Sequence, residues 1–402
     1  MANDMPSKGG IPLWEPFICG NEWAYVKECL DTGWVSSAGP FVERFERMMA
    51  EHAGARYAVA TVNGTAALHI ALLVAGVQPN DEVLVPTLTF IAPANAVRYV
   101  GAWPVFMDAE PVYWQMDTEK AVSFLEKECD WRQGSLYNRT TGRRIAAILP
   151  AHILGHPVDL DPVLAVARKY GLVVIEDAAE SLGARYKART VGHLGDIGCF
   201  SFNGNKIVTC GGGGMIVTDN ANWAARAKYL TTQAKDDSTE YRHSEVGFNY
   251  RLTNIQAAFG CAQLEQLERF VECKRRLAAA YSRGLDAVCG ILTPREAQWA
   301  SSTFWMYTVR VEKSRFGMTN RELCGRLRES GIETRLLWLP IHRNPPHARC
   351  HVYQVEVANQ LYDEGLSLPS AVSLPDHHSA RVVRAILESR ADFTTGKTAV
   401  LP

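Results

Sequence analysis

The chain has 402 residues, of which 47% are apolar and 21% are charged, as is usual for a folded protein with a sizeable core. Its 42 Lys and Arg residues nearly balance its 43 Asp and Glu residues, so the formal net charge is −1. Proteins that bind nucleic acid through its phosphates are normally basic, so this balance disfavours nucleic-acid binding. The same figures disfavour intrinsic disorder. The length predicts two or three domains, or one large domain with a smaller one.

Membrane and metal signals are missing from the sequence. No run approaches the roughly 20 apolar residues that cross a bilayer, and residues 1–8 lack the apolar stretch of a signal peptide. The 10 cysteines form no Cys-x-x-Cys pair, and no His-Glu-x-x-His motif occurs. We therefore expect a cytoplasmic protein with reduced thiols, no membrane association and no metal site.

Short apolar strands alternate with helices through the first part of the chain. An apolar helix is predicted over residues 65–75, ending at Gly76, because glycine readily adopts the left-handed backbone of a helix end. The polar and basic segment 129–144 predicts a surface insertion or a hairpin. The other elements predicted up to this point are strands over 82–85, 103–107 and 145–149 and a helix over 91–100.

The alternation continues beyond residue 160. Asp161 and Pro162 predict the start of a helix that closes at Gly171, because aspartate caps helices and proline suits the first turn. The apolar run 172–175 predicts a strand buried on both faces, as in parallel sheets. Further strands are predicted over 197–202 and 215–217. Together these elements predict an α/β domain with a mostly parallel sheet covered by helices.

The pattern changes after about residue 253. A long helical stretch is predicted over 254–283, followed by a strand over 307–311 and helices over 320–330 and 379–387. This change predicts a large domain over 1–265 and a smaller α+β domain over 266–402. We expect the last residues, 394–402, to be weakly ordered.

Ligands of open parallel sheets bind beyond the carboxyl ends of the strands, and two features of the sequence fall there. Gly64 and Thr65 open the apolar helix, and a helix N-terminus with free N–H groups is a phosphate site; the alternative is an ordinary N-cap made by Thr65. Asp177 follows a buried strand, where a carboxylate needs a metal, an arginine or a protonated heterocycle to offset its burial. The alternative for Asp177 is a loop residue that caps the next helix.

Lys206 is the third feature, since it follows an apolar strand and precedes four glycines, residues 211–214. A lysine in a dry pocket is a nucleophile towards carbonyl groups, and glycines let the backbone approach a ligand closely. The alternative is a solvated lysine beside a flexible turn. Together the three features match pyridoxal phosphate, whose aldehyde needs a lysine, whose pyridine nitrogen needs a carboxylate and whose phosphate needs a helix N-terminus.

The residues that carry these features also carry a family resemblance. The stretches are NGTAALH (63–69), PTLTFIAPANA (86–96), IEDAAESLG (175–183), GDIGCFSFNGNKIVTCGGGGM (195–215) and GFNYRLTNIQAA (247–258). The chain resembles the DegT/DnrJ/EryC1/StrS family of sugar aminotransferases from about residue 11 to about residue 385. This resemblance implies the fold type I of pyridoxal phosphate enzymes, which is that of aspartate aminotransferase. Within the family the chain looks most similar to the LegC-like branch, which aminates C4 of UDP-4-keto-6-deoxy-N-acetylhexosamines.

The resemblance implies roles for the residues around the cofactor. Lys206 would form the Schiff base with pyridoxal phosphate and then move the proton between the cofactor and the sugar carbon. Asp177 would pair with the pyridinium nitrogen. Gly64, Thr65 and Ser201 would hold the phosphate.

Three further cofactor contacts follow from the resemblance. Phe90 would lie over the pyridine ring, the alternative being an ordinary core phenylalanine. Glu180 stands where many members carry Gln or His near the cofactor's ring oxygen. Asn249 would reach the phosphate from the neighbouring subunit, the alternative being a turn residue.

The candidates for substrate contact are Arg251, His152 and His342. Arg251 would lie at the rim of the site or in a structural ion pair. A histidine at a strand end or beside a proline is often a structural residue, and that alternative stays open for both histidines.

By resemblance, the reaction moves the amino group of L-glutamate to C4 of a nucleotide-linked 4-keto-6-deoxy sugar in a ping-pong sequence, within a homodimer with shared active sites. Alternatives are a family aminotransferase acting on another keto sugar or a keto-inositol, including C3 amination and the GDP-perosamine type, and a non-catalytic pyridoxal phosphate sensor. Dehydratases of the family replace the lysine with histidine, so Lys206 favours amino transfer.

Overall fold

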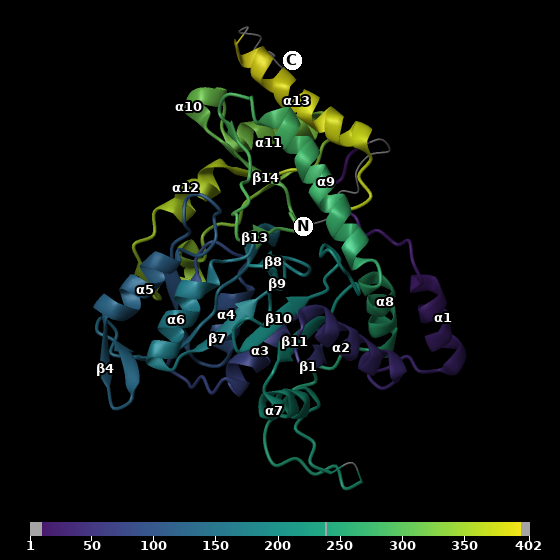
Figure 1. Ribbon diagram of the computed structural model, residues 1–402, viewed down its shortest axis with the longest axis vertical. Helices are drawn as coiled ribbons and strands as arrows, with labels where there is room; N and C mark the ends of the chain where they lie inside the picture. The colour runs from purple at the N-terminus through teal and green to yellow at the C-terminus, as the bar shows by residue number, and fades with distance from the viewer. Residues whose placement is uncertain (1–9, 238, 395–402) are drawn as a thin grey trace.

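A computed structural model describes residues 10–237 and 239–394 of the protein. Figure 1 shows a larger lower part built around a central sheet and a smaller upper part that contains α9 (Leu267–Leu285), α11 (Asn320–Glu329) and α13 (Asp376–Thr394). The expectation for residues 394–402 falls, beyond Thr394, outside the described residues. In the described ranges, no helix combines the length and the apolar character needed to cross a bilayer.

The central sheet has ten strands within the described part of the chain. Its main path runs in the order β1 (Tyr57–Thr61), β11 (Gly214–Thr218), β10 (Ile197–Ser201), β7 (Val173–Asp177), β6 (Arg144–Ile148), β2 (Glu82–Pro86), β3 (Trp103–Met107) and β16 (His351–Tyr353). Strand β11 is antiparallel to both of its neighbours, and the other pairs along this path are parallel. The prediction of a mostly parallel, mixed α/β sheet is therefore confirmed.

Helices cover both faces of this sheet because its strands are apolar on both faces. Along β2, Val83 and Val85 pack into a cluster with α3 (Gly64–Val74) and α4 (Ala92–Tyr99). Leu84 points to the opposite face, where α5 (Thr118–Lys127) and α6 (Leu160–Tyr170) pack. The other helices on the sheet are α2 (Pro40–Ala53), α7 (Ala221–Thr231) and α8 (Asn254–Leu264).

Two predictions about segment boundaries meet different outcomes. Segment 129–144 contains the antiparallel hairpin β4 (Cys129–Arg132) and β5 (Ser135–Asn138), which confirms the predicted hairpin. The predicted start of α6 at Asp161 is wrong, because Asp159 takes the extended N-cap conformation and the helix begins one residue later. Asp161 instead lies in the first turn and pairs with Lys187.

The stretch predicted as one helix over 254–283 is two helices, α8 and α9. Helix α8 packs on α1 (Glu22–Thr32) and α2 in the core of the lower part. Helix α9 then rises into the upper part, where its Tyr281 and Leu285 lie in a separate apolar cluster. The predicted domain boundary at 265/266 falls at this junction and stays a prediction, while β16 returns from the C-terminal region to pair with β3.

The upper part is built on a four-stranded antiparallel sheet of described residues, in the order β12 (Ile291–Leu292), β14 (Thr308–Val311), β17 (Gly365–Ser367) and β15 (Arg335–Leu336). The first described residues lie beside it, since Ile11 pairs with Ile332. The remaining elements are β8 (Arg185–Tyr186), β9 (Arg189–Thr190), β13 (Ala300–Ser301), α10 (Lys313–Phe316), α12 (Val357–Glu364) and three 3₁₀ turns, Ile153–Gly155, Ile341–Arg343 and Pro345–His347.

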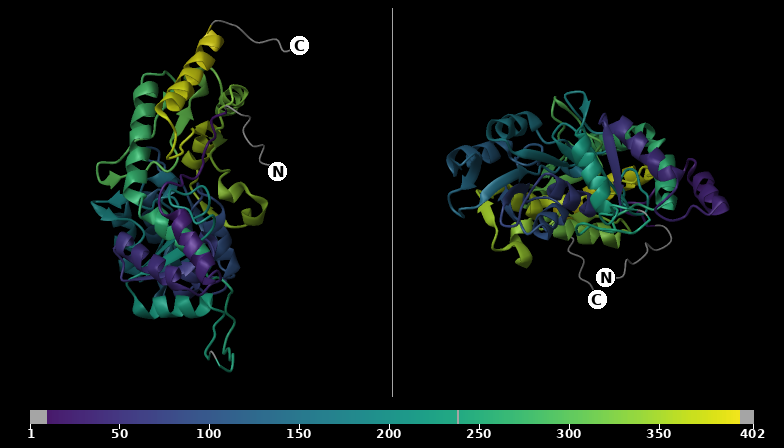
Figure 2. Two further views of the ribbon diagram at one scale, coloured as in Figure 1. Left: turned by 90° about the vertical axis from the view of Figure 1, so that its right-hand side faces the viewer. Right: turned by 90° about the horizontal axis from the view of Figure 1, so that it is seen from below.

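The segment between α7 and α8 projects from the body of the molecule. Figures 1 and 2 show it extending beyond α7, away from the upper part. Tyr241 and Val246 in this segment are 69% and 83% exposed. The projection therefore presents apolar side chains that the rest of this chain does not cover.

Candidate active site

A cavity of about 440 Å³ lies at the carboxyl end of the parallel strands, between the sheet and the upper part. Its walls include Leu13 of the N-terminal segment, Asp177 at the end of β7 and Trp305 of the segment before β14. Eight of the residues predicted from the sequence line it: Gly64, Thr65, Phe90, His152, Asp177, Glu180, Ser201 and Lys206. The topology of the sheet thus brings together segments that are far apart in the sequence.

One end of the cavity is the N-terminus of α3. Asn63 is the N-cap, and its Oδ1 accepts the N–H of Ala66 at 2.8 Å, so the alternative of a cap made by Thr65 is wrong. The N–H groups of Gly64 and Thr65, in the first turn, have no intrahelical acceptor and face the positive end of the helix dipole. These donors and the nearby hydroxyl of Ser201 are suited to a phosphate.

The close approach of α3 to β10 depends on glycine. A Cβ atom at Gly64 would lie 2.8 Å from the Cβ of Ser201, a distance that real Cβ atoms do not reach. Any side chain here would push the helix away from the strand and separate the two groups of phosphate donors.

The loop after β10 holds Lys206 between anchored neighbours. Phe202, Ile207 and Val208 are buried in the cluster that α2 and α8 cover. The N–H of Lys206 donates to the carbonyl of Asn203 at 2.9 Å. Because apolar residues fix the loop on either side, the lysine side chain is directed into the cavity.

The Lys206 ammonium lies beside the ring of Trp305 and the carboxylate of Glu180. Its Nζ is 4.3 Å from the centre of the Trp305 ring and 3.5 Å from Glu180 Oε1. Its side chain is only 12% exposed, so the alternative of a solvated loop lysine does not hold.

Asp177 is buried at the end of β7 with few partners. Among the described residues, the one hydrogen bond that its carboxylate accepts comes from the N–H of Ala179, at 3.0 Å. Burial raises the pKa of Asp177, and the N–H of Ala179 and the charge of Lys206 only partly oppose this. A buried carboxylate with so few donors fits a positively charged partner inside the cavity, as the pyridinium of pyridoxal phosphate requires.

Glu180 shares the pocket with Asp177. Burial raises its pKa as well; the charge of Lys206 lowers it, and that of Asp177 raises it further. Its Oε2 accepts the N–H of Leu154 at 2.9 Å. Glu180 therefore links the Lys206 side of the cavity to the segment that follows β6.

His152 lines the cavity, but the protein uses both of its ring nitrogens. Nδ1 accepts the N–H of Val158 at 3.0 Å, which leaves Nε2 as the protonated nitrogen, 3.0 Å from Glu176 Oε2. Burial alone would raise the pKa of Glu176, but hydrogen bonds from His152 and from the N–H groups of Gly195 and Gly192 hold it below its ordinary value. His152 can therefore meet a ligand only through its ring face.

The remaining predicted residues differ in position. Phe90 is 56% exposed and lines the cavity, so it is not a core phenylalanine. Asn249 and Arg251 are exposed and outside the cavity walls, and Asn249 pairs with Thr232 through a backbone bridge. His342 is also outside the walls and lies 2.7 Å from Thr87 Oγ1.

Several wall residues were missed from the sequence: Leu13, Thr89, Asn203, Asn205, Trp305, Met306, Arg335, Leu337 and Trp338. Asn203 and Asn205 could have been found from their place beside Lys206. Thr89 could likewise have been found from its place beside Phe90. The remaining ones come from the N-terminal segment and from the upper part, and no local pattern marks them as neighbours of the sheet. Within residues 10–237 and 239–394, no group of three or more His, Cys, Asp or Glu side chains could hold a metal ion.

Comparison with solved structures gives the class of the protein. A DegT DnrJ EryC1 StrS aminotransferase from Brucella abortus superposes with a TM-score of 0.84 at 28% identity, covering 92% of this chain and 95% of that chain. DesI, solved in the presence of its TDP-sugar product, superposes with a TM-score of 0.85 at 28% identity, covering 96% and 94%. The fold and the site define a pyridoxal phosphate-dependent aminotransferase.

Comparison of sequences gives the family. The model of the DegT/DnrJ/EryC1/StrS aminotransferase family matches residues 17–387. A GDP-perosamine synthase of Caulobacter vibrioides is 40% identical over 96% of this chain and 98% of its own length. A GDP-perosamine synthase of Escherichia coli O157:H7 is 38% identical over 95% and 99%. The protein belongs to the DegT/DnrJ/EryC1/StrS family and is a sugar aminotransferase.

Proposed function

We propose that the protein transfers the amino group of L-glutamate to C4 of a GDP-linked 4-keto-6-deoxy sugar. The observation that carries this proposal is the near full-length similarity, at 40% and 38% identity, to two proteins named GDP-perosamine synthase. These relatives favour the GDP-perosamine type of acceptor over the UDP-linked N-acetylhexosamine of the LegC-like branch. The branch prediction has no support among these comparisons.

We propose distinct roles for the side chains of the cavity. Pyridoxal phosphate, when bound, supplies an electron sink for the bond that breaks at the substrate carbon. Lys206 holds the aldehyde carbon of the cofactor and, once its amine is free, takes and returns the proton at the reacting carbon. Asp177 keeps the ring nitrogen positive. Gly64, Thr65 and Ser201 would bind the phosphate, and Phe90 would lie over the ring.

Other residues complete the proposed site. Glu180 holds Lys206 through the 3.5 Å contact and would lie near the ring oxygen of the bound cofactor. Trp305 covers Lys206 on the side of the upper part and keeps bulk water away from its amine. His152 packs its ring against the ligand, while Arg251 and His342 stay candidates for substrate contact.

The experiment that tests the function follows the cofactor's visible absorbance. Purified protein with pyridoxal phosphate should show a yellow band that bleaches on addition of L-glutamate. The aminated enzyme should then regain the band with a GDP-linked 4-keto-6-deoxyhexose, and regain it at least about tenfold more slowly with the UDP-linked N-acetyl analogue. A preference for the UDP sugar would overturn the GDP assignment. A band that does not respond to glutamate would overturn either L-glutamate as the donor or the reaction class. Lys206→Ala should abolish turnover.

We also propose that the protein works as a homodimer with shared active sites. Asn249 is exposed and outside the cavity of its own chain, in the segment between α7 and α8. Helix α1 adds exposed apolar side chains, since Trp23 and Leu30 are 81% and 60% exposed. Exposed apolar surface of this kind marks a protein interface. Asn249 would then reach the phosphate of the partner's cofactor.

Mixing two inactive variants tests this assembly. If Asn249→Asp and Lys206→Ala each abolish turnover, subunits exchanged between them should regain about a quarter of the wild-type activity, because half of the dimers carry one intact site out of two. No recovery in a confirmed mixed dimer would place Asn249 in the site of its own chain.

The ten free cysteines favour the reducing cytoplasm as the location.

A further inference from the structure

Lys274 of α9 is a lysine with an unusual environment. It is 1% exposed, and no carboxylate of the described residues pairs with it. Its Nζ donates to the carbonyl oxygen of Trp305 at 2.6 Å and to that of Ser370, and lies 4.3 Å from the centre of the Trp14 ring. Burial lowers the pKa of Lys274 well below its ordinary value. A buried amine without an acid is costly, so its retention calls for a physical reason.

The two tryptophans that Lys274 contacts both hold the loop of Lys206. Trp14 Nε1 donates to the carbonyl of Gly204 at 2.7 Å, and Trp305 Nε1 donates to the carbonyl of Asn205 at 2.7 Å. These carbonyls belong to the two residues that directly precede Lys206. The Trp305 ring in addition faces the Lys206 ammonium.

Three distant segments meet at the Lys274 amine. Ser370 donates its N–H to the carbonyl of Leu13 at 2.8 Å, which fixes the residue before Trp14. Its hydroxyl oxygen accepts the N–H of Tyr307 at 3.0 Å, which fixes the segment that follows Trp305. Lys274 therefore joins the N-terminal segment, the segment before β14 and the segment after β17 at one point behind the Lys206 loop.

We propose that Lys274 is a positioning residue for Lys206. Its amine holds Trp14 and Trp305 in place, and their indole N–H groups fix the two carbonyls that precede Lys206. The position of the Lys206 amine relative to the cofactor and the substrate thus depends on a side chain that touches neither. This inference rests on the proposed function in one respect, that Lys206 is the reacting amine.

The first test uses the cofactor-free protein and does not depend on activity. Hydrogen–deuterium exchange followed by mass spectrometry measures the opening of the 203–206 loop. Lys274→Met should speed exchange in this loop by about tenfold or more, because two buried carbonyls lose their donor and both indoles lose their support. Trp14→Phe and Trp305→Phe should speed exchange in the same loop, since each removes one indole donor.

Tyr281→Phe is the matched control. Tyr281 is also buried on α9, and its hydroxyl donates to the carbonyl of Pro369 at 2.9 Å, directly before Ser370. This variant removes a buried hydrogen bond of the same region without touching either tryptophan. Exchange in the 203–206 loop should stay within about twofold of the wild type.

The second test uses the holoenzyme in a single turnover with L-glutamate. Lys274→Met should lower the limiting rate by about tenfold and leave the half-saturating glutamate concentration within about twofold, because the amine is misplaced and the binding surface is intact. Rescue of the rate by Lys274→Arg, which keeps a buried donor, would support the same conclusion. A wild-type enzyme that does not react with glutamate would refute the proposed function, while the exchange measurement would still decide the positioning role.

Equal loop exchange in Lys274→Met and Tyr281→Phe would overturn the proposal, because Lys274 would then be a core residue only. If Lys274→Met does not fold, the two tryptophan variants decide. Wild-type exchange of the loop in both Trp14→Phe and Trp305→Phe would overturn the proposal as well.

Discussion

Two aspartates follow strands of the same sheet in similar sequences, and the structure surrounds them differently. Asp108 follows β3 in the sequence Asp-Ala-Glu, and Asp177 ends β7 in the sequence Asp-Ala-Ala-Glu. They are 0% and 7% exposed. Asp177 accepts one hydrogen bond from the described residues, whereas Asp108 accepts hydrogen bonds from Lys120 Nζ and from the N–H groups of Ala109, Glu356, Val357 and Ala358.

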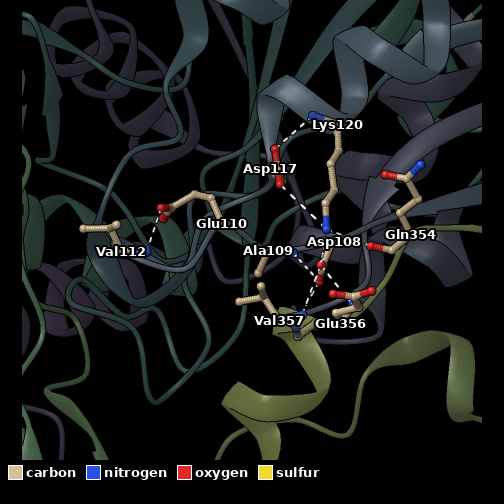
Figure 3. Close-up of polar contacts among 10 residues, drawn as sticks. Asp108, Ala109, Glu110, Val112, Asp117, Lys120, Gln354, Glu356 and Val357 are labelled. Atoms are coloured by element: carbon tan, nitrogen blue, oxygen red, sulfur yellow. Dashed lines mark hydrogen bonds and ion pairs between the residues drawn. The ribbon is translucent and has the colours of Figure 1, made fainter. Parts of the chain in front are cut away.

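The carboxylate of Asp108 connects the end of β3 to α5 and α12. Figure 3 shows its carboxylate between Lys120 of α5 and the N-terminal end of α12, with the carbonyl of Gln354 as a second partner of Lys120. Burial alone would raise the pKa of Asp108, but Lys120 and the N–H groups of α12 hold it below its ordinary value. The pKa of Asp177 moves the other way. An acid that the protein itself satisfies is structural, while an acid left with free lone pairs towards a cavity is available to a ligand.

Asp177→Asn should produce the larger functional effect. We expect turnover to fall by about 100-fold or more, because a neutral amide cannot stabilise a positive ring nitrogen. The free energy of unfolding of the cofactor-free protein should change by less than about 1 kcal/mol or rise, since asparagine has the same shape and removes a buried charge. Steady-state rates and urea unfolding measure the two effects, and wild-type turnover in the variant would contradict the role of Asp177.

Asp108→Asn should show the reverse pattern. The free energy of unfolding should fall by about 2–4 kcal/mol. The NH₂ group of asparagine would face N–H donors and cannot accept their hydrogen bonds, and Lys120 would lose its ionic partner. Turnover per folded molecule should stay within about twofold of the wild type. Urea unfolding with both aspartate variants side by side makes each the control of the other. A stability loss in Asp177→Asn as large as in Asp108→Asn would end the distinction.

The pH dependence of stability should separate the two acids by sign. Asp108 has a folded pKa below its ordinary value of 3.8, so its contribution is full above about pH 4 and is lost as the pH falls through the folded pKa. Asp177 has a folded pKa above 3.8, so its carboxylate destabilises the cofactor-free protein increasingly as the pH rises from about 4 through the folded pKa. Lys206 and Glu180 are the charged groups beside it.

Urea unfolding of the cofactor-free proteins between about pH 3 and pH 7 tests these signs. Asp108→Asn should flatten the loss of stability on the acid side. Asp177→Asn should gain stability over the wild type only towards the upper end of the range. The same sign of change in both variants would show that burial alone, and not the donor set, decides the behaviour of these acids.

Much of the fold could be predicted from the sequence. Of the two aspartates, the sequence predicted the functional position of Asp177 but not the structural role of Asp108. Apolar runs and helix ends gave β2, β3, β7 and the α/β class, because these depend on residues close together in the chain. The positions of Gly64, Asp177 and Lys206, each at the carboxyl end of a predicted strand or at the helix start that follows it, predicted their meeting at one edge of the sheet. The N-cap of α6 was predicted two residues too late, at Asp161 instead of Asp159. Both aspartates suit a cap, and local pattern does not decide between them.

What could not be predicted depends on residues far apart in the chain. Three of the donors that satisfy Asp108 lie at the N-terminal end of α12, about 250 residues further on, so its sequence looks as functional as that of Asp177. Trp305 reaches Lys206, and Trp14 reaches Gly204, only once the upper part and the N-terminal segment have packed against the sheet. No pattern within either segment indicates those contacts.

The smallest expected effect measures how much the Lys120–Asp108 ion pair contributes to stability apart from the backbone N–H donors. Lys120 Nζ lies 2.7 Å from Asp108 Oδ2, but its side chain is 24% exposed, so solvent weakens the pair. Lys120→Met should lower the free energy of unfolding by about 1 kcal/mol, less than Asp108→Asn, because the N–H groups of α12 still stabilise the carboxylate. Lys169→Met, which breaks the exposed pair with Glu126, is the control and should cause no measurable change.

A double-mutant cycle between Lys120→Met and Asp108→Asn, measured by urea unfolding, isolates the pair itself. If Lys120→Met costs as much as Asp108→Asn, the ion pair and not the helix end is the main partner of Asp108. The contrast with Asp177 would then rest on one ion pair, since Lys120 pairs with Asp108 whereas Lys206, beside Asp177, pairs with Glu180. A smaller loss in Lys120→Met means that the number of backbone donors decides whether a buried acid at a strand end is structural or free to bind a ligand.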